Sequence, residues 1–139
     1  MWAESLLMHI EIEDKGTHLV CTIPEGFAVS DAEVMMTLII DACVQTGKRR
    51  VLIDFSVMKK PWPATSKLLG ALIADEHMTR FKDRYGKTIK LAILGQPPFI
   101  STYRPTRDFL QQAGQNAETF TSLKEAPKWL LPSEVGKIN

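Results

Sequence analysis

Two short apolar runs in the middle of the chain constrain its fold most. The first reads "RVLIDF" at 50–55 and the second reads "TIKLAILG" at 88–95. A strand with one face in water would alternate apolar and polar residues, whereas these runs are almost continuously apolar. Such runs are typical of strands that are buried on both faces, as in parallel sheets covered by helices. The sequence therefore predicts an α/β domain.

Two more strands and a helix are predicted before the first run. The segments 8–13 and 18–23 read as the strands of a hairpin, with Gly16 in its turn. Ser30-Asp31-Ala32-Glu33 matches a capping box, which predicts a helix with Ser30 as its N-cap. That helix is expected to run to Thr46, with Gly47 as its stop signal.

Three more helices and one strand are predicted later in the chain. A helix should begin near Pro63 and end at Gly86, and it carries Leu68, Leu69, Leu72 and Ile73. Another helix has Pro105 near its first turn and Gly114 past its end. A strand at 117–120 precedes a last helix, for which Ser122 is the expected N-cap.

This order of elements predicts one domain. The string β-β-α-β-α-β-α-β-α implies a mostly parallel, five-stranded mixed sheet with four helices, and the first hairpin adds an antiparallel edge. The domain is expected to span 8–131, with a C-terminal tail at 132–139. A chain of 139 residues suits a single hydrophobic core.

The overall composition excludes few classes of function. The net charge of +1 gives no overall reason to bind nucleic acid. Cys21 and Cys43 lie in apolar patterns, so both are expected to be buried and unpaired, as in a reducing cytoplasm. No histidine spacing suggests a metal site, and no cofactor is expected. The start "MWAESLLMHI" resembles neither a signal peptide nor a membrane span.

Charge is divided unevenly along the sequence. Residues 1–47 hold eight acids and one base, a net charge of −7, whereas residues 48–90 hold eleven bases and four acids, a net charge of +7. The two segments are expected to pair across one surface, because blocks of sequence mix on folding. The alternative is a basic face built by the middle of the chain.

Three motifs in this order resemble the SpoIIAA-like (STAS) family, and more narrowly its small bacterial STAS/SEC14-type members. They are the strand that ends in Asp54, then "AILG" at 92–95, then "ETFTSLKEAPKWL" with Ala126, Trp129 and Leu130. The resemblance covers roughly residues 8–131. It implies the STAS fold and a non-enzymatic regulatory or binding role, since better-known STAS domains bind proteins or nucleotides.

The resemblance also implies a candidate phosphoacceptor. STAS anti-sigma-factor antagonists carry Asp-Ser-Ser-Gly-Leu at a helix start, and their second Ser is phosphorylated. The matching stretch here is Ala64-Thr65-Ser66-Lys67-Leu68, which places Ser66 at the acceptor position but lacks the Asp and the Gly. Thr65 and Ser66 are also ordinary N-cap residues, and capping is the favoured interpretation.

The loops after the two apolar runs form the candidate binding site. Ligands of open α/β sheets bind beyond the carboxyl ends of strands, and helix N-termini attract anions there. Asp54 is expected to accept N–H groups of its own loop, with a catalytic base as the alternative. The site should hold an anionic or amphipathic ligand, or the acidic face of a partner, through Lys59, Lys60, Trp62, Lys67, Tyr103, Arg104 and Arg107.

The first helix suggests a second surface. Its apolar residues cover more of the helical wheel than one sheet contact requires. The excess strip Met36, Ile40 and Val44 is expected to meet either another segment of the same chain, such as the N-terminal one, or a second subunit, as in a homodimer. The chain is therefore interpreted as a cytoplasmic binding or regulatory module. A carrier of a small hydrophobic or lipid-like ligand is the alternative, and an enzyme comes third.

Overall fold

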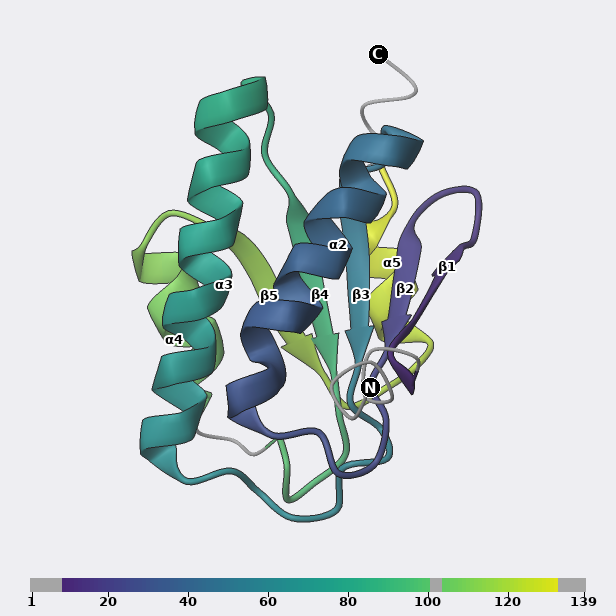
Figure 1. Cartoon of the computed structure of the whole chain (residues 1–139). Helices are drawn as coiled ribbons and strands as arrows, with labels where there is room; N and C mark the ends of the chain where they lie inside the picture. The colour runs from purple at the N-terminus through teal and green to yellow at the C-terminus, as the bar shows by residue number, and fades with distance from the viewer. Residues whose placement is uncertain (1–8, 101–103, 133–139) are drawn as a thin grey trace.

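A five-stranded mixed sheet forms the centre of the molecule (Figure 1). The computed structural model describes residues 9–100 and 104–132. The strands are β1 (Glu11–Asp14), β2 (Leu19–Thr22), β3 (Arg50–Asp54), β4 (Lys90–Leu94) and β5 (Asn116–Phe120), in the spatial order β1-β2-β3-β4-β5. β1 pairs antiparallel with β2, and every other pair is parallel. The predicted sheet is confirmed, with β3 and its final residue Asp54 at the centre.

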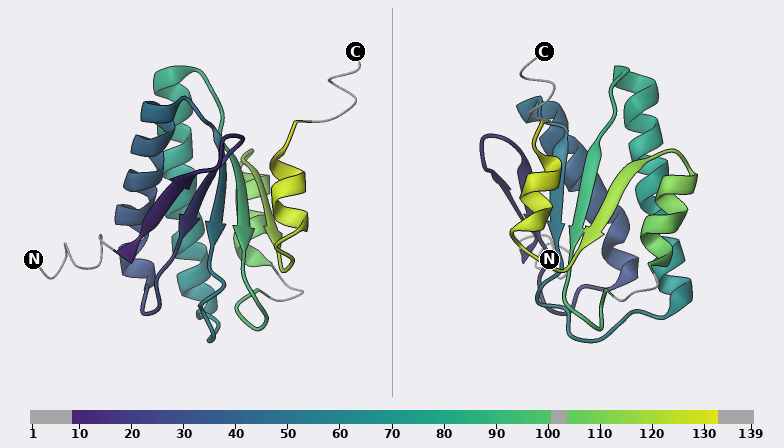
Figure 2. Two further views of the ribbon diagram at one scale, coloured as in Figure 1. Left: turned by 90° about the vertical axis from the view of Figure 1, so that its right-hand side faces the viewer. Right: turned by 180° about the vertical axis from the view of Figure 1, so that it is seen from behind.

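Within residues 9–100 and 104–132, four helices cover the two faces of this sheet. They are α2 (Ala32–Thr46), α3 (Ala64–Tyr85), α4 (Pro105–Gln112) and α5 (Glu125–Leu130), and a 3-10 turn, η1 (Val29–Asp31), leads into α2. α2, α3 and α4 lie on one face, which we call the three-helix face, and α5 lies alone on the other (Figure 2). The predicted element order is therefore correct.

Each central strand contributes side chains to both layers. Val51 and Ile53 of β3 pack under the three-helix face, whereas Leu52 packs with Ala126 and Leu130 of α5. β4 repeats this division, with Leu91 and Ile93 on one side and Ala92 and Leu94 on the other. This double burial explains why the two sequence runs are almost continuously apolar.

Two glycines end the long helices as predicted. Gly47 follows α2 with φ of 76°, and Gly86 follows α3 with φ of 69°. At these left-handed positions a Cβ atom would be strained, so glycine is the residue that stops each helix.

Neither serine that was predicted as an N-cap occupies that position. Ser30 is not the N-cap of α2, because the chain enters through η1 and the N-cap is Asp31. The Asp31 carboxylate accepts the N–H of Ala28 at 2.9 Å and so closes this entry turn. The hydroxyl of Ser122 accepts the N–H of Glu125 at 3.4 Å, but the N-cap of α5 is Lys124.

The wide apolar face of α2 packs partly against another segment of the same chain, which was one of the two predicted alternatives. Met36 is only 1% exposed and belongs to the core, so its assignment to a dimer face is wrong. α2 packs against α3 as well as the sheet, and two contact surfaces need a broad apolar face. His77 of α3 adds a polar contact here, 2.8 Å from a carboxylate oxygen of Glu33. In the proposed strip, Ile40 is half-buried and only Val44 is well exposed.

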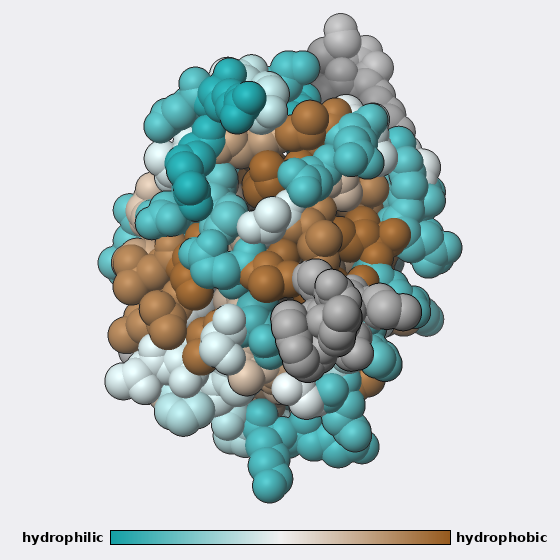
Figure 3. Space-filling view, in the orientation of Figure 1, coloured by the Kyte–Doolittle hydropathy of each residue, from teal (hydrophilic) through white to brown (hydrophobic). Residues whose placement is uncertain are grey.

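The leucines of α3 face outward. Leu68, Leu69 and Leu72 are 43%, 46% and 52% exposed, while smaller Ala71 and Ala74 face the sheet. These leucines contribute to the apolar patches that interrupt the hydrophilic surface of the three-helix side (Figure 3). None of the described helices is both long and apolar enough to cross a bilayer.

Two glycine substitutions should have opposite effects on stability. A Cβ at Gly95 would lie 3.0 Å from Phe99 Cδ2 and 3.1 Å from the Ile100 side chain, so Gly95→Ala should lower the free energy of unfolding by about 1–3 kcal/mol. A Cβ at Gly70, inside α3, would meet Trp62 at an ordinary 3.5 Å, so Gly70→Ala should raise it by about 0.5–1 kcal/mol. Urea titration measures both free energies of unfolding. A change in the same direction in the two variants would contradict the described packing.

Both thiols should resist modification in the folded protein. Cys21 and Cys43 are buried and unpaired, and burial raises their pKa values to about 12 and about 11. The thiolate is the reactive form, so a thiol reagent at about pH 8 should label neither until denaturant exposes both. Because the unfolded thiols ionise near pH 9.0 and the folded ones do not, their contribution to stability should be lost as pH rises from 9 towards 12. A rapidly labelled native thiol would refute this.

Candidate functional site

The candidate site lies at the carboxyl ends of β3 and β4. The chain leaves β3 through residues 55–63 before α3 begins, and it leaves β4 through residues 95–104 before α4 begins. Both strands are parallel and adjacent, so the two loops start side by side. The backbone binds them together, since the N–H of Phe55 donates to the carbonyl of Leu94 at 2.8 Å. The predicted juxtaposition of the two loops is therefore correct.

Aromatic side chains from three loops pack together at this edge. The Trp62 ring stacks on Phe27 with ring centroids 6.1 Å apart, and it meets Phe99 edge-on at 5.6 Å. Phe55 lies among them, 5.0 Å from Phe99. Such pairs add packing energy beyond their burial. They hold Trp62 against the core, although the loop that carries it is otherwise exposed.

A small apolar cavity of about 80 Å³ lies between the sheet and the three-helix face. Its walls come from α2, α3, α4 and the ends of the strands, and most are aliphatic or aromatic. An enclosed space of about 150 Å³ holds one benzene molecule, so this cavity fits a smaller apolar group. The apolar walls include Met35, Ile53, Phe55, Trp62, Ala74, Leu91, Ile93, Phe99, Ile100 and Leu110.

Three cationic side chains line the same cavity, namely Lys67 of α3 and Arg104 and Arg107 at the start of α4. All three are half-buried, whereas most of the apolar lining residues are buried. We infer that the cations surround the opening towards solvent. The Thr106 hydroxyl donates to the carbonyl of Lys67 at 3.2 Å and joins α4 to α3 beside them.

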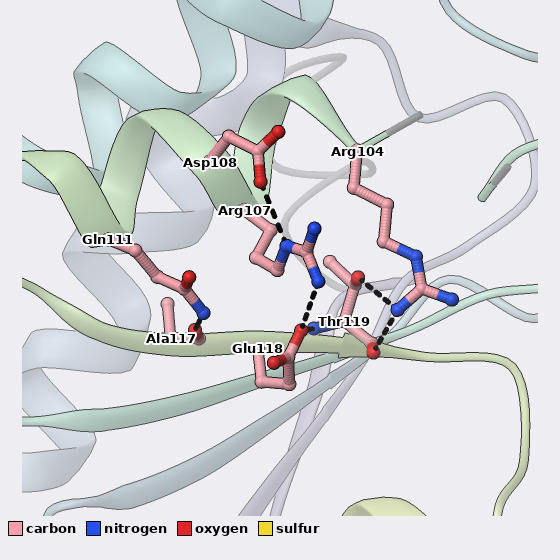
Figure 4. Close-up of polar contacts among 7 residues, drawn as sticks. All are labelled: Arg104, Arg107, Asp108, Gln111, Ala117, Glu118 and Thr119. Carbon is pink, nitrogen blue, oxygen red and sulfur yellow. Dashed lines mark hydrogen bonds and ion pairs between the residues drawn. The ribbon is translucent and has the colours of Figure 1, made fainter. Parts of the chain in front are cut away.

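The two arginines are held by β5, as Figure 4 shows. Arg104 donates from one nitrogen to the carbonyl and the hydroxyl of Thr119, at 3.0 and 3.1 Å. Arg107 lies 3.0 Å from Asp108 and 3.5 Å from Glu118. The hydrogen bond that Arg107 donates to the Asp108 carboxylate is the main reason that the pKa of Arg107 is raised.

The cations differ in how far their charge is already balanced. Arg107 has two carboxylate partners, so little of its charge is left for a ligand. Lys67 makes no ion pair with any residue that the structure describes. An incoming anion would therefore find its strongest unbalanced attraction at Lys67.

The structure assembles only part of the predicted site. Trp62, Lys67, Arg104 and Arg107 meet at the cavity, whereas Lys59 and Lys60 are exposed and do not line it. Tyr103 lies outside the described residues. Asp54 does not line the cavity either, and its carboxylate accepts the N–H of Ser56 at 2.9 Å. The loop-stabilising interpretation of Asp54 is therefore confirmed.

Capping by Thr65 or Ser66 is not observed. The N-cap of α3 is Pro63, and no side-chain hydrogen bond caps this helix. Thr65 and Ser66 instead lie inside the first turn. The reason is local: Pro63 holds the extended backbone that an N-cap requires, with ψ of 155°, so the helix starts directly after it.

Sequence reasoning missed the polar residues that β5 and α4 supply, above all Thr106, Glu118 and Thr119. Thr119 follows Ala117 by two residues in β5, so its side chain lies on the same face of the sheet as that buried alanine. A threonine at an inward-facing position of a short strand was an available signal, since buried hydroxyls need partners. Its partner, Arg104, could not be read from spacing alone.

Two helix starts should respond differently to alanine. Ser66→Ala should change the free energy of unfolding by at most about 0.5 kcal/mol, because Ser66 caps nothing and alanine suits a helix interior. Asp31→Ala should cost about 1 kcal/mol, because it removes the acceptor of the Ala28 N–H. Thermal or urea unfolding measures both variants. A larger loss in Ser66→Ala than in Asp31→Ala would contradict the described helix starts.

Comparison with known proteins adds no assignment. The chain matches no protein-family model, and no curated protein is similar enough in sequence to count as a relative.

Proposed function

We propose that the protein is a non-enzymatic binding module whose ligand is a small amphipathic anion. The observation that carries this proposal is the combination of an apolar cavity with a cationic opening, where Lys67 has no described ion-pair partner. The apolar part of the ligand would fill the cavity, and its carboxylate or phosphate would lie beside Lys67. Arg104 and Thr106 are further donors that line the site.

The lining residues argue against acid–base catalysis. Among the described residues around the cavity there is no aspartate, glutamate, histidine or cysteine. The groups that most often transfer protons or act as nucleophiles near neutral pH are thus missing from the wall. Ligand binding without catalysis is therefore the function that these lining residues support best.

The alternative function is a carrier of a hydrophobic or lipid-like ligand, and it rests on the same cavity. Pockets that enclose a drug-sized ligand measure about 300–1,000 Å³. A cavity of about 80 Å³ is far smaller, so it supports a short apolar group better than a lipid chain.

The resemblance to the SpoIIAA-like (STAS) family supports a regulatory use of such binding. The five-stranded mixed sheet with this element order is compatible with that fold. In that case the binding of a ligand or an acidic partner at the opening would regulate how this protein interacts with another molecule. Ser66, in the first turn of α3, would be the position to modify, although Ala64 and Lys67 replace two residues of the family motif.

Reversing one charge at the opening should abolish most of the affinity. Isobutyrate and isobutyl phosphate are suitable probes, because each joins an apolar group smaller than benzene to an anion. Lys67→Glu should weaken their binding about tenfold or more, since a hydrogen bond to a charged group contributes about 1.5–3 kcal/mol. Lys60→Glu is the matched control, because it makes the same charge change on an exposed residue that does not line the cavity.

Trp62 fluorescence and native mass spectrometry can measure this binding, with Trp62→Phe to assign the signal to the cavity wall. Equal losses in both lysine variants would show that only net charge matters. Equal affinity for isobutyl alcohol, the neutral analogue, would favour the hydrophobic carrier instead. Failure of every probe to bind would refute the proposed site.

A further inference from the structure

Two turns at the amino ends of β3 and β4 are strongly basic. The α2–β3 turn and the end of α3 with its following turn contribute six cations, which we call the amino-end patch: Lys48, Arg49, Arg50, Lys82, Arg84 and Lys87. Within segments 46–50 and 82–89 the only acid is Asp83. The patch lies at the opposite end of the parallel strands from the cavity (Figure 1).

Backbone and side-chain contacts hold the two turns together. The N–H of Lys90 donates to the carbonyl of Arg49 at 2.8 Å, and the Arg49 guanidinium donates to the carbonyl of Thr88 at 3.3 Å. The six charges therefore gather on one surface although they come from two distant parts of the sequence. The two turns supply the cations for the basic face that the charge distribution offered as an alternative.

Most of this charge is not balanced internally. Lys48 pairs with Asp14 at 2.9 Å, as expected if the acidic and basic segments mix. Arg49, Lys82, Arg84 and Lys87 are all exposed, and none forms an ion pair with a described residue. Lys82 and Arg84 offset the negative end of α3, but a helix end carries only about half a charge.

We propose that the amino-end patch docks the protein on an anionic lipid bilayer. Helix ends and turns form the patch, and α3 projects beyond the edge of the sheet there (Figure 1). A flat charged surface suits such a projecting patch, because it requires no groove and attracts each nearby Lys or Arg. Tyr85, 41% exposed beside Arg84, has the apolar ring and polar tip that suit the headgroup layer.

Nucleic acid fits this surface less well. Duplex recognition usually places a helix or a ribbon in a groove, whereas both helices here end at the patch. Single strands bind by stacking bases on open aromatic faces. The Tyr85 ring is already contacted by Phe81, with centroids 5.0 Å apart, and by Arg84. Docking through this end would leave the cavity on the side away from the bilayer.

Vesicle sedimentation tests the proposal, with the double variant Lys82→Glu/Lys87→Glu as the main probe. Neither side chain makes a described hydrogen bond or ion pair, so the variant should stay folded, which circular dichroism can check. Lys59→Glu/Lys60→Glu is the matched control, because it changes the net charge equally in the loop before α3, at the other end of the sheet.

The wild-type chain should bind vesicles with about one third phosphatidylserine at about 0.1 M salt, and should be released at about 1 M salt. The main variant should bind about 25-fold more weakly, roughly fivefold for each cation lost, while the control stays near wild type. Three results would overturn the proposal: no binding to these vesicles, equal losses in both variants, or tighter binding of an oligonucleotide at the same salt.

Discussion

Double burial of β3 and β4 is the constraint on which the rest of the structure depends. Each strand sends alternate side chains into two different cores, one under α2, α3 and α4 and one under α5. Val51 and Leu52 show the division within two consecutive residues. A strand in this position needs helices on both faces, and parallel strands need long crossovers that those helices supply.

That arrangement also creates the candidate site. Parallel strands end at one common edge, so the loops before α3 and α4 must start beside each other there. Phe55, Trp62 and Phe99 fill the space between these loops. The cavity remains where small residues of α3, Gly70 and Ala74, face the larger residues of the sheet.

The two ends of the sheet differ in the way they use positive charge. At the carboxyl end, Arg104 and Arg107 are fixed by bonds to β5, so they shape a defined opening around an apolar space. At the amino end, Arg49, Lys82, Arg84 and Lys87 project from helix ends and turns without such fixing partners of opposite charge. A fixed opening favours selection of one small ligand, whereas an array of exposed cations without ion-pair partners favours diffuse attraction to a surface.

The sequence by itself determined the secondary elements and their order, because local signals specify them. Continuous apolar runs marked β3 and β4, and Gly47 and Gly86 marked the helix ends through a backbone conformation that other residues rarely adopt. The sequence also identified Trp62, Lys67, Arg104 and Arg107 as neighbours, because both loops follow adjacent strands.

Prediction from the sequence failed where the outcome depended on packing between distant segments. Met36 lies in the core although the helical wheel assigned it to the surplus apolar strip, and Thr119 meets Arg104 because β5 is the edge strand next to β4. The closure of the entry to α2 by Asp31 rather than Ser30 is a local contact over three residues, which the capping-box pattern placed at the wrong residue. Only the tertiary structure decided that two basic turns lie together, because the hydrogen bond from Arg49 to the carbonyl of Thr88 joins residues 39 apart and leaves no periodic or local trace in the sequence.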